Sequence, residues 1–135
     1  MSLSNATETA LLSYIFDDTN PSWHGASDFY VALYTADPGE AGTAPTNEIA
    51  YTSYARVAIS RTTGFTVSGN TAENAALIQF PTCTGGSGTA THFGIVTSSS
   101  GAGTLICSGA LSSSLAISSG IQPQFNAGDL NVVAD

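Results

Sequence analysis

Residues 28–34, with the sequence DFYVALY, decide the fold class of this chain. The large apolar side chains of Phe29, Val31 and Leu33 recur at every second position, which is the period of a β-strand. Smaller or amphipathic side chains fill the positions between them. We therefore expect a half-buried strand in this stretch.

A turn follows this strand directly. Three residues indicate this turn. The side chain of Asp37 can bond the nearby backbone, the ring of Pro38 fixes φ, and Gly39 is free to adopt positive φ. We assign these three residues a structural role.

Similar short stretches recur along the rest of the chain, separated by segments rich in Gly, Ser, Asn and Pro. Further strands are expected at Ile49–Ser53, Arg56–Ser60, Gly64–Ser68, Ala75–Phe80, Thr89–Thr97, Thr104–Ser108, Leu111–Ile117 and Asp129–Val133. Short strands at such intervals are typical of sandwiches and barrels. The sequence predicts a mainly β protein: an antiparallel β-sandwich or partly closed barrel of about eight or nine short strands.

A short α-helix is expected before the first strand. Asn5 is suited to cap it, and Glu8, three residues later, completes a capping-box pattern. Two apolar pairs lie four positions apart on one face: Leu11 with Ile15, and Leu12 with Phe16. A helix of about thirteen residues is marginal alone. It must dock either on its own domain or on a partner.

The length of 135 residues favours one domain, residues 1–135, with a helix and arm in 1–27 and a β-sandwich in 28–135. Apolar residues make up 42% of the chain, enough for a core. Cys83 and Cys107 are expected to be reduced and buried rather than joined in a disulfide.

The charge balance excludes several functions. Two Lys or Arg residues stand against ten Asp or Glu residues, a net charge of −8. This balance opposes binding to nucleic acid or to an anionic membrane surface. The first fifteen residues lack the basic start of a signal peptide, so synthesis in a cytoplasm is expected. Residues 74–128 carry no formal charge, which fits either a hydrated β surface or a surface covered by neighbouring subunits.

Groups suited to catalysis are few. His92 lies in a strand-like run and is expected to be structural, while His24 lies in a loop four residues before Asp28, a weak metal-ligand pattern. Asp37 and Glu40 do not form a calcium-loop pattern. No serine or cysteine has the spacing of a known nucleophile or metal motif. We expect no enzyme activity, no metal and no cofactor.

Several motifs of this chain resemble those of a family of small virion proteins from tailed bacteriophages. The motifs are YVALYTADPGE at 30–40, NEI at 47–49, YARVAI at 54–59, the strand and proline at 76–81, THFGI at 91–95, and the segments 105–111 and 125–130. The likeness covers residues 4–133. Members of this family are usually labelled tail-fibre proteins, and some related proteins serve as capsid cement.

The resemblance implies a structural protein on the outer surface of the head or on the tail of a virion. The interpretation that we favour from the sequence is a capsid cement or decoration protein that binds the major capsid protein in many copies, as a homotrimer. The alternative is a tail-fibre or receptor-binding module that contacts tail proteins and stacks exposed aromatic rings on cell-surface glycans. The aromatic candidates for that role are Trp23, Tyr30, Tyr34, Tyr51 and Tyr54.

Two further assignments complete the expected sites. The candidate interface consists of Leu11, Leu12, Ile15, Phe16, Trp23 and His24, although core burial explains the aromatic residues equally well. Arg56 is expected to pair with an acid such as Glu48; alternatively, Arg56 and Arg61 contact an acidic partner.

Overall fold

A five-stranded antiparallel sheet dominates the computed structural model, which describes residues 2–134. Its strands lie in the order β1-β8-β7-β2-β3. Their bounds are Ser2–Leu3 for β1, Asp28–Tyr34 for β2, Val57–Ser60 for β3, Ser87–Val96 for β7 and Leu105–Ser118 for β8. In register, Leu33 of β2 lies opposite Phe93 of β7, and Phe29 of β2 lies opposite Ile59 of β3.

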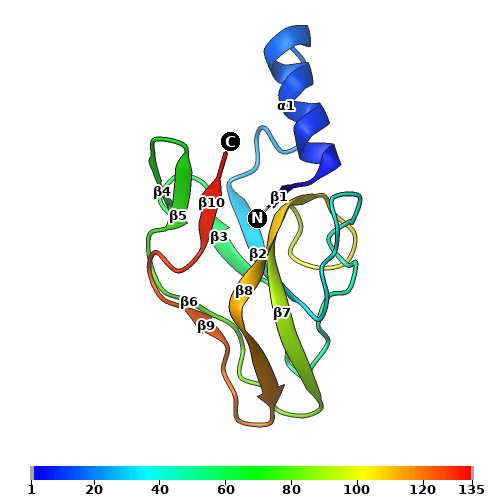
Figure 1. Ribbon diagram of the computed structural model, residues 1–135, viewed down its shortest axis with the longest axis vertical. Coiled ribbons are helices and arrows are strands. Elements are labelled where there is room, and N and C mark those ends of the chain that lie inside the picture. Colours follow the sequence, from blue (N-terminus) through cyan, green and yellow to red (C-terminus); the bar gives the residue numbers. More distant parts are fainter. Residues whose placement is uncertain (1, 135) are drawn as a thin grey trace.

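Two smaller antiparallel sheets face this sheet (Figure 1). One has the order β10-β5-β4 and the other pairs β6 with β9. Their bounds are Phe65–Ser68 for β4, Thr71–Asn74 for β5, Ile78–Gln79 for β6, Gln124–Phe125 for β9 and Asn131–Val133 for β10. The predicted sandwich-like, mainly β fold is confirmed, and the strands of residues 2–134 form no closed barrel.

The main core lies between these sheets, and a second, smaller core lies on the other face of β2. Val31 and Leu33 belong to the main core, while Ala32 and Tyr34 belong to the second. All four side chains are at most 1% exposed. The prediction of a half-buried β2 is therefore wrong for its second half, because apolar layers cover both faces there.

The strand boundaries differ from the prediction where pairing is irregular. The two strands expected at Thr104–Ser108 and Leu111–Ile117 form the single strand β8, whose pairing with β7 shifts register after Ala110. Residues 49–53 form only one isolated bridge, between Thr52 and Gly85. The strands β1, β5 and β9 were not predicted. The strands β1 and β9 have two residues each, too few to show a period of two, and β5, with the sequence TAEN, has no large apolar side chain.

Candidate functional site: the α1 arm and two surface hollows

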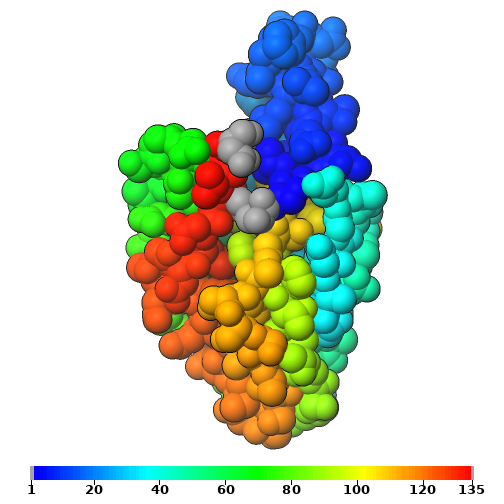
Figure 2. All heavy atoms as spheres, in the orientation of Figure 1, coloured from blue at the N-terminus to red at the C-terminus, as the bar shows by residue number. Residues whose placement is uncertain are grey.

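The helix α1, Asn5–Asp17, projects well beyond the β layers (Figures 1 and 2). Thr7 is its one buried residue. Its four candidate interface side chains are exposed: Leu11 by 40%, Leu12 by 58%, Ile15 by 65% and Phe16 by 81%. A helix with this much apolar surface is normally covered. The α1 arm, residues 5–17, therefore carries an apolar surface that its own chain leaves open.

The base of the α1 arm is fixed to β8 by hydroxyl groups. The Ser4 Oγ accepts a hydrogen bond of 3.2 Å from the Thr7 N–H, and the Ser4 hydroxyl donates to the Leu105 carbonyl. The Thr7 hydroxyl donates to the Ile106 carbonyl at 2.9 Å. Ser4 is thus the N-cap, and the prediction of Asn5 is wrong: Ser4 is extended, and Asn5 is already helical.

The free end of the arm is acidic. Asp18 ends α1 in the left-handed conformation, with φ of 49°, and its N–H donates to the Ser13 carbonyl. The carboxyl end of a helix carries a partial negative charge, which disfavours nearby anions. Asp17 and Asp18 lie at this end, and the last turn contains no basic residue. A cation from outside the helix would therefore stabilise the arm.

The predicted turn supports the base of the arm. Gly39 adopts positive φ, 73°, and its N–H donates to Asp37 Oδ1 at 2.9 Å, while Pro38 is buried. The carbonyl of Glu40, the next residue, accepts a hydrogen bond of 2.9 Å from Asn5 N–H. The turn thus helps to orient α1, a role that local sequence patterns did not indicate.

The loop with the other two candidate interface residues is attached elsewhere. Arg61 Nη1 donates to the carbonyls of Trp23 and Ala26, both at 2.8 Å, and to that of His24 at 3.3 Å. Trp23 is half-buried and His24 is exposed. The structure therefore brings Trp23 and His24 to Arg61, whereas the four candidate side chains of α1 lie on the projecting arm.

The two remaining structural candidates lie inside the fold. Arg56 forms the expected ion pair with Glu48 at 2.7 Å, and its side chain is 1% exposed. This burial contradicts the alternative role of Arg56 as a contact for an acidic partner. His92 is half-buried in β7, where its Nδ1 lies 2.9 Å from the Thr91 hydroxyl.

Most tyrosines proposed as glycan platforms belong to the core. Tyr34 is 0% exposed and Tyr51 is 3% exposed. Tyr54 is half-buried, and its hydroxyl donates to Glu48 Oε1 at 2.8 Å. Tyr30 is half-buried against the second core. The expectation of exposed stacking rings is wrong for Tyr34 and Tyr51, because Tyr34 packs in the second core and Tyr51 packs in the main core.

Burial also keeps several titratable groups neutral. It raises the pKa of the Cys107 thiol to about 12. Burial, followed by the effect of Glu48, raises the pKa of the Tyr34 hydroxyl above its ordinary value. Burial is also the main reason why the pKa of Tyr54 is raised. Cys83 and Cys107 are both buried free thiols. These groups belong to the core.

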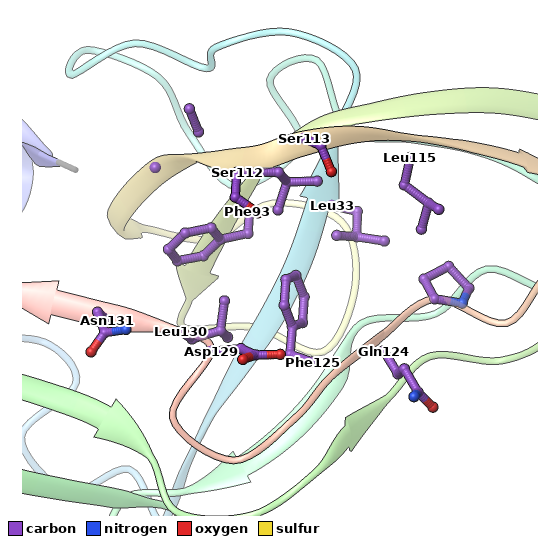
Figure 3. A pocket seen from close by; sticks show the side chains of 14 residues that line it. Leu33, Phe93, Ser112, Ser113, Leu115, Gln124, Phe125, Asp129, Leu130 and Asn131 are labelled. Atoms are coloured by element: carbon purple, nitrogen blue, oxygen red, sulfur yellow. The ribbon is translucent and has the colours of Figure 1, made fainter.

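The larger surface hollow, of about 570 Å³, lies between β8 and the segment 123–131 (Figure 3). The rings of Phe93 and Phe125 lie at its apolar side, with centroids 6.2 Å apart. Ser112, Gln124 and Asp129 contribute polar groups. Asp129 is the one ionisable side chain of this lining, and its Oδ2 already accepts a hydrogen bond from the Asn126 N–H. The lining therefore lacks the pair of carboxyl groups used in glycoside hydrolysis.

A smaller apolar groove, of about 230 Å³, lies between the five-stranded sheet and the sheet β10-β5-β4. Phe29 and Ile95 come from the first sheet, and Phe65 and Val67 from the second. Arg61 lies at this groove, with its guanidinium carbon 4.7 Å from the centroid of the Phe29 ring. The groove thus combines an apolar lining with one cation.

Residues 2–134 contain neither a cluster of metal-ligating side chains nor a membrane-spanning helix. No three His, Cys, Asp or Glu side chains come together in an arrangement suited to a metal ion. No helix in that part of the chain has the length and apolar character needed to cross a membrane.

The comparisons with known proteins identify the family. No curated protein matches the chain. The family described as "Podophage GP4 fiber I protein gp80" matches residues 2–133, nearly the whole sequence. This match confirms the resemblance to a phage virion family with a tail-fibre label. The chain therefore belongs to the podophage GP4 fiber I protein gp80 family of bacteriophage structural proteins.

Proposed function

We propose that this protein is a structural component of a phage tail-fibre assembly, and that the α1 arm is the element through which it assembles. In this role the protein acts by binding and shape and transforms no substrate. Its partners are tail proteins of the same phage and further copies of itself, as in a homotrimer. The observation that carries the proposal is the exposed apolar surface of α1, from Leu11 to Phe16.

The physical argument rests on the cost of leaving this surface in water. Burial of apolar area stabilises by about 25 cal/mol per Å², and large side chains in a protein contact contribute most. Leu12, Ile15 and Phe16 are each more than half exposed in the single chain. A partner that covers them also adds the packing that a short helix needs. The arm is therefore suited to association.

The distribution of charge supports assembly as well. Residues 74–128 carry no formally charged side chain, and most of the second half of β8 is exposed. The centres of protein interfaces are depleted of charge. The net charge of −8 opposes contact with packaged DNA, which fits a position on the outside of a particle.

The fibre assembly is preferred over capsid cement because of the family description, which names a fibre protein. Cement on the head remains the alternative. The two locations differ in copy number and in fractionation. A fibre component is present in few copies and stays with the tail when heads and tails are separated, whereas cement is present in many copies and stays with the head.

The experiment uses phage particles that carry substitutions in this protein. Leu12→Asp places a charge in the exposed apolar surface of α1, and we expect washed particles to lose most of the protein. Ile121→Asp is the matched control, because Ile121 is also exposed, by 38%, but lies outside the arm. Quantitative mass spectrometry of purified particles measures the copy number, and circular dichroism confirms that each variant folds.

Two results would contradict the proposal. Normal amounts of the Leu12→Asp protein on particles would show that α1 is not the element through which the protein assembles. Release of the wild-type protein with the heads, in many copies, would replace the fibre location with the cement alternative.

A further inference from the structure

The apolar groove between the two sheets is open to solvent at one of its walls. Val67 of β4 lines the groove and is 73% exposed, although it is a large apolar residue in a strand. A water molecule occupies about 30 Å³ of liquid. The groove volume of about 230 Å³ is several times that of one water molecule, so the groove has room for a large side chain.

Arg61 gives this groove a charge without a counter-charge. Its Nη1 is occupied by loop carbonyls, and its guanidinium lies over the Phe29 ring. The ion pair found within residues 2–134 joins Arg56 to Glu48 instead. Since the chain has only two basic residues, Arg61 is the cation that remains for an acid from elsewhere.

The tip of the α1 arm has the complementary features. Phe16, at 81%, is the most exposed of the large apolar side chains in residues 2–134. Asp17 and Asp18 follow it directly, at the helix end where their charges are disfavoured. The tip thus presents one large ring followed by carboxylates, and the groove presents an apolar hollow beside a guanidinium.

The arm and the groove lie at the same end of the molecule. The Ile106 carbonyl anchors Thr7 at the base of α1, and Ile106 also lines the groove. Figures 1 and 2 show that α1 points away from the body from this base. Because Phe16 is largely exposed, its own groove does not hold it. An arm that extends away from its own body is therefore free to enter the groove of another copy.

We propose that the α1 arm of one copy inserts Phe16 into the apolar groove of a second copy, where Asp17 or Asp18 meets Arg61. The occupant of the groove is therefore the same segment of another copy of this chain. This proposal rests on the role of α1 in assembly, and it names the surface that receives the arm.

The first test uses the purified chain alone and measures its mass in solution by sedimentation equilibrium over a range of concentrations. We expect reversible oligomers for the wild type. Phe16→Asp on the arm and Val67→Asp in the groove are each expected to weaken association at least tenfold. Both residues are mostly exposed in the single chain, so neither change disturbs the core. Ile121→Asp is the control that keeps wild-type association.

Mixing the two variants tests the pairing directly. The Val67→Asp chain keeps an intact arm, and the Phe16→Asp chain keeps an intact groove. An equimolar mixture is therefore expected to form mixed oligomers at concentrations where each variant alone associates weakly. Asp17→Lys is expected to weaken wild-type association, because it places a cation beside Arg61.

Other outcomes would overturn the inference. If Phe16→Asp dissociates the oligomer and Val67→Asp does not, the helices pack on one another and not in the groove. If the wild-type chain is monomeric at all concentrations, or if neither variant changes its mass, the exchange of arms is wrong. A monomeric chain that still needs Leu12 for incorporation into particles would leave the proposed function intact, so the two failures are distinguishable.

Discussion

The buried Arg56 and the half-buried Glu48 form an ion pair with two parallel hydrogen bonds, from Nε to Oε1 and from Nη2 to Oε2, each of 2.7 Å. The other donors of Arg56 reach the carbonyls of Ser98 at 2.9 Å and Gly101 at 2.8 Å. Arg56 directly precedes β3, and Ser98 and Gly101 belong to the loop between β7 and β8. The guanidinium therefore joins three distant segments.

Removal of the carboxylate should destabilise the fold strongly. Glu48→Ala leaves the Arg56 charge buried without its partner, which costs about 3–5 kcal/mol in comparable pairs. Arg56→Lys should also destabilise, because lysine lacks the two parallel donors. Urea unfolding measures the free energy. Glu73→Ala, at an exposed acid, is the control and should change the stability by less than about 1 kcal/mol. A similar small change for Glu48→Ala would show that solvent reaches the Arg56 site.

The buried side chain of Asn74 should be as important as the ion pair. Its Oδ1 accepts a hydrogen bond of 2.9 Å from the Leu130 N–H, and its Nδ2 donates to the carbonyls of Asn126 at 2.9 Å and Ala76 at 2.8 Å. Asn74→Ala leaves these backbone groups without a partner, and we expect a loss of about 3 kcal/mol in urea unfolding.

The matched control for this change is Asn20→Ala, because Asn20 is exposed. Equal stability of the two variants would mean that water replaces the amide of Asn74. A selective loss would show that this side chain connects β5 to the segment before β10.

The sequence predicted those features that depend on neighbouring positions. The period of two in residues 29–34 predicted β2, and the acid and base at Glu48 and Arg56 predicted an ion pair that the structure confirms. The apolar pairs from Leu11 to Phe16 predicted the helix, which forms as Asn5–Asp17. Propensity and short-range pairing are sufficient in these cases.

Features that depend on distant backbone groups could not be predicted. The partners of Asn74 lie up to 56 residues away, and no local pattern distinguishes this residue from an asparagine in a turn. The cap at Ser4 is favoured over Asn5 because β8 supplies acceptors for the Ser4 and Thr7 hydroxyls. The projection of α1 was left open by the sequence, since an apolar face does not indicate what covers it.

Gly94 should tolerate no side chain. A Cβ at this position would lie 2.7 Å from Cε2 of the Tyr34 ring and 2.9 Å from Cδ1 of Leu105. Overpacking of this kind costs about 1–3 kcal/mol, so Gly94→Ala should lower the midpoint of thermal unfolding. Gly25→Ala is the control, because its Cβ would meet no atom within 4 Å. An unchanged midpoint for Gly94→Ala would mean that the second core can expand.

The stability of the protein should fall at alkaline pH, partly through Cys107. Burial raises the pKa of this thiol from 9.0 to about 12, so the unfolded chain releases the proton at a lower pH than the folded chain. The stabilisation is therefore complete below pH 9.0 and is lost as the pH rises toward about 12, by roughly 1 kcal/mol per pH unit. Urea unfolding between neutral pH and about pH 11 measures this slope. Cys107→Ala should make the slope smaller, and an unchanged slope would exclude the thiol as its source.

The hydroxyl groups at the base of α1 should control the order of the arm without controlling the fold of the body. Ser4→Ala removes the cap and Thr7→Val removes the bond to Ile106, and each change costs about 1 kcal/mol. Because most of α1 packs on nothing else in the chain, we expect faster hydrogen exchange in residues 5–17 and little change in the β-sheets. Thr9→Val, at an exposed position of the same helix, is the control.

A variant that carries both Ser4→Ala and Thr7→Val extends this prediction to association. If the wild-type arm binds its partner as a preformed helix, the arm of this double variant must first become ordered when it binds. Association should therefore weaken, although the apolar surface is unchanged. Unchanged exchange in α1 would show that the helix is stable without these two hydroxyls.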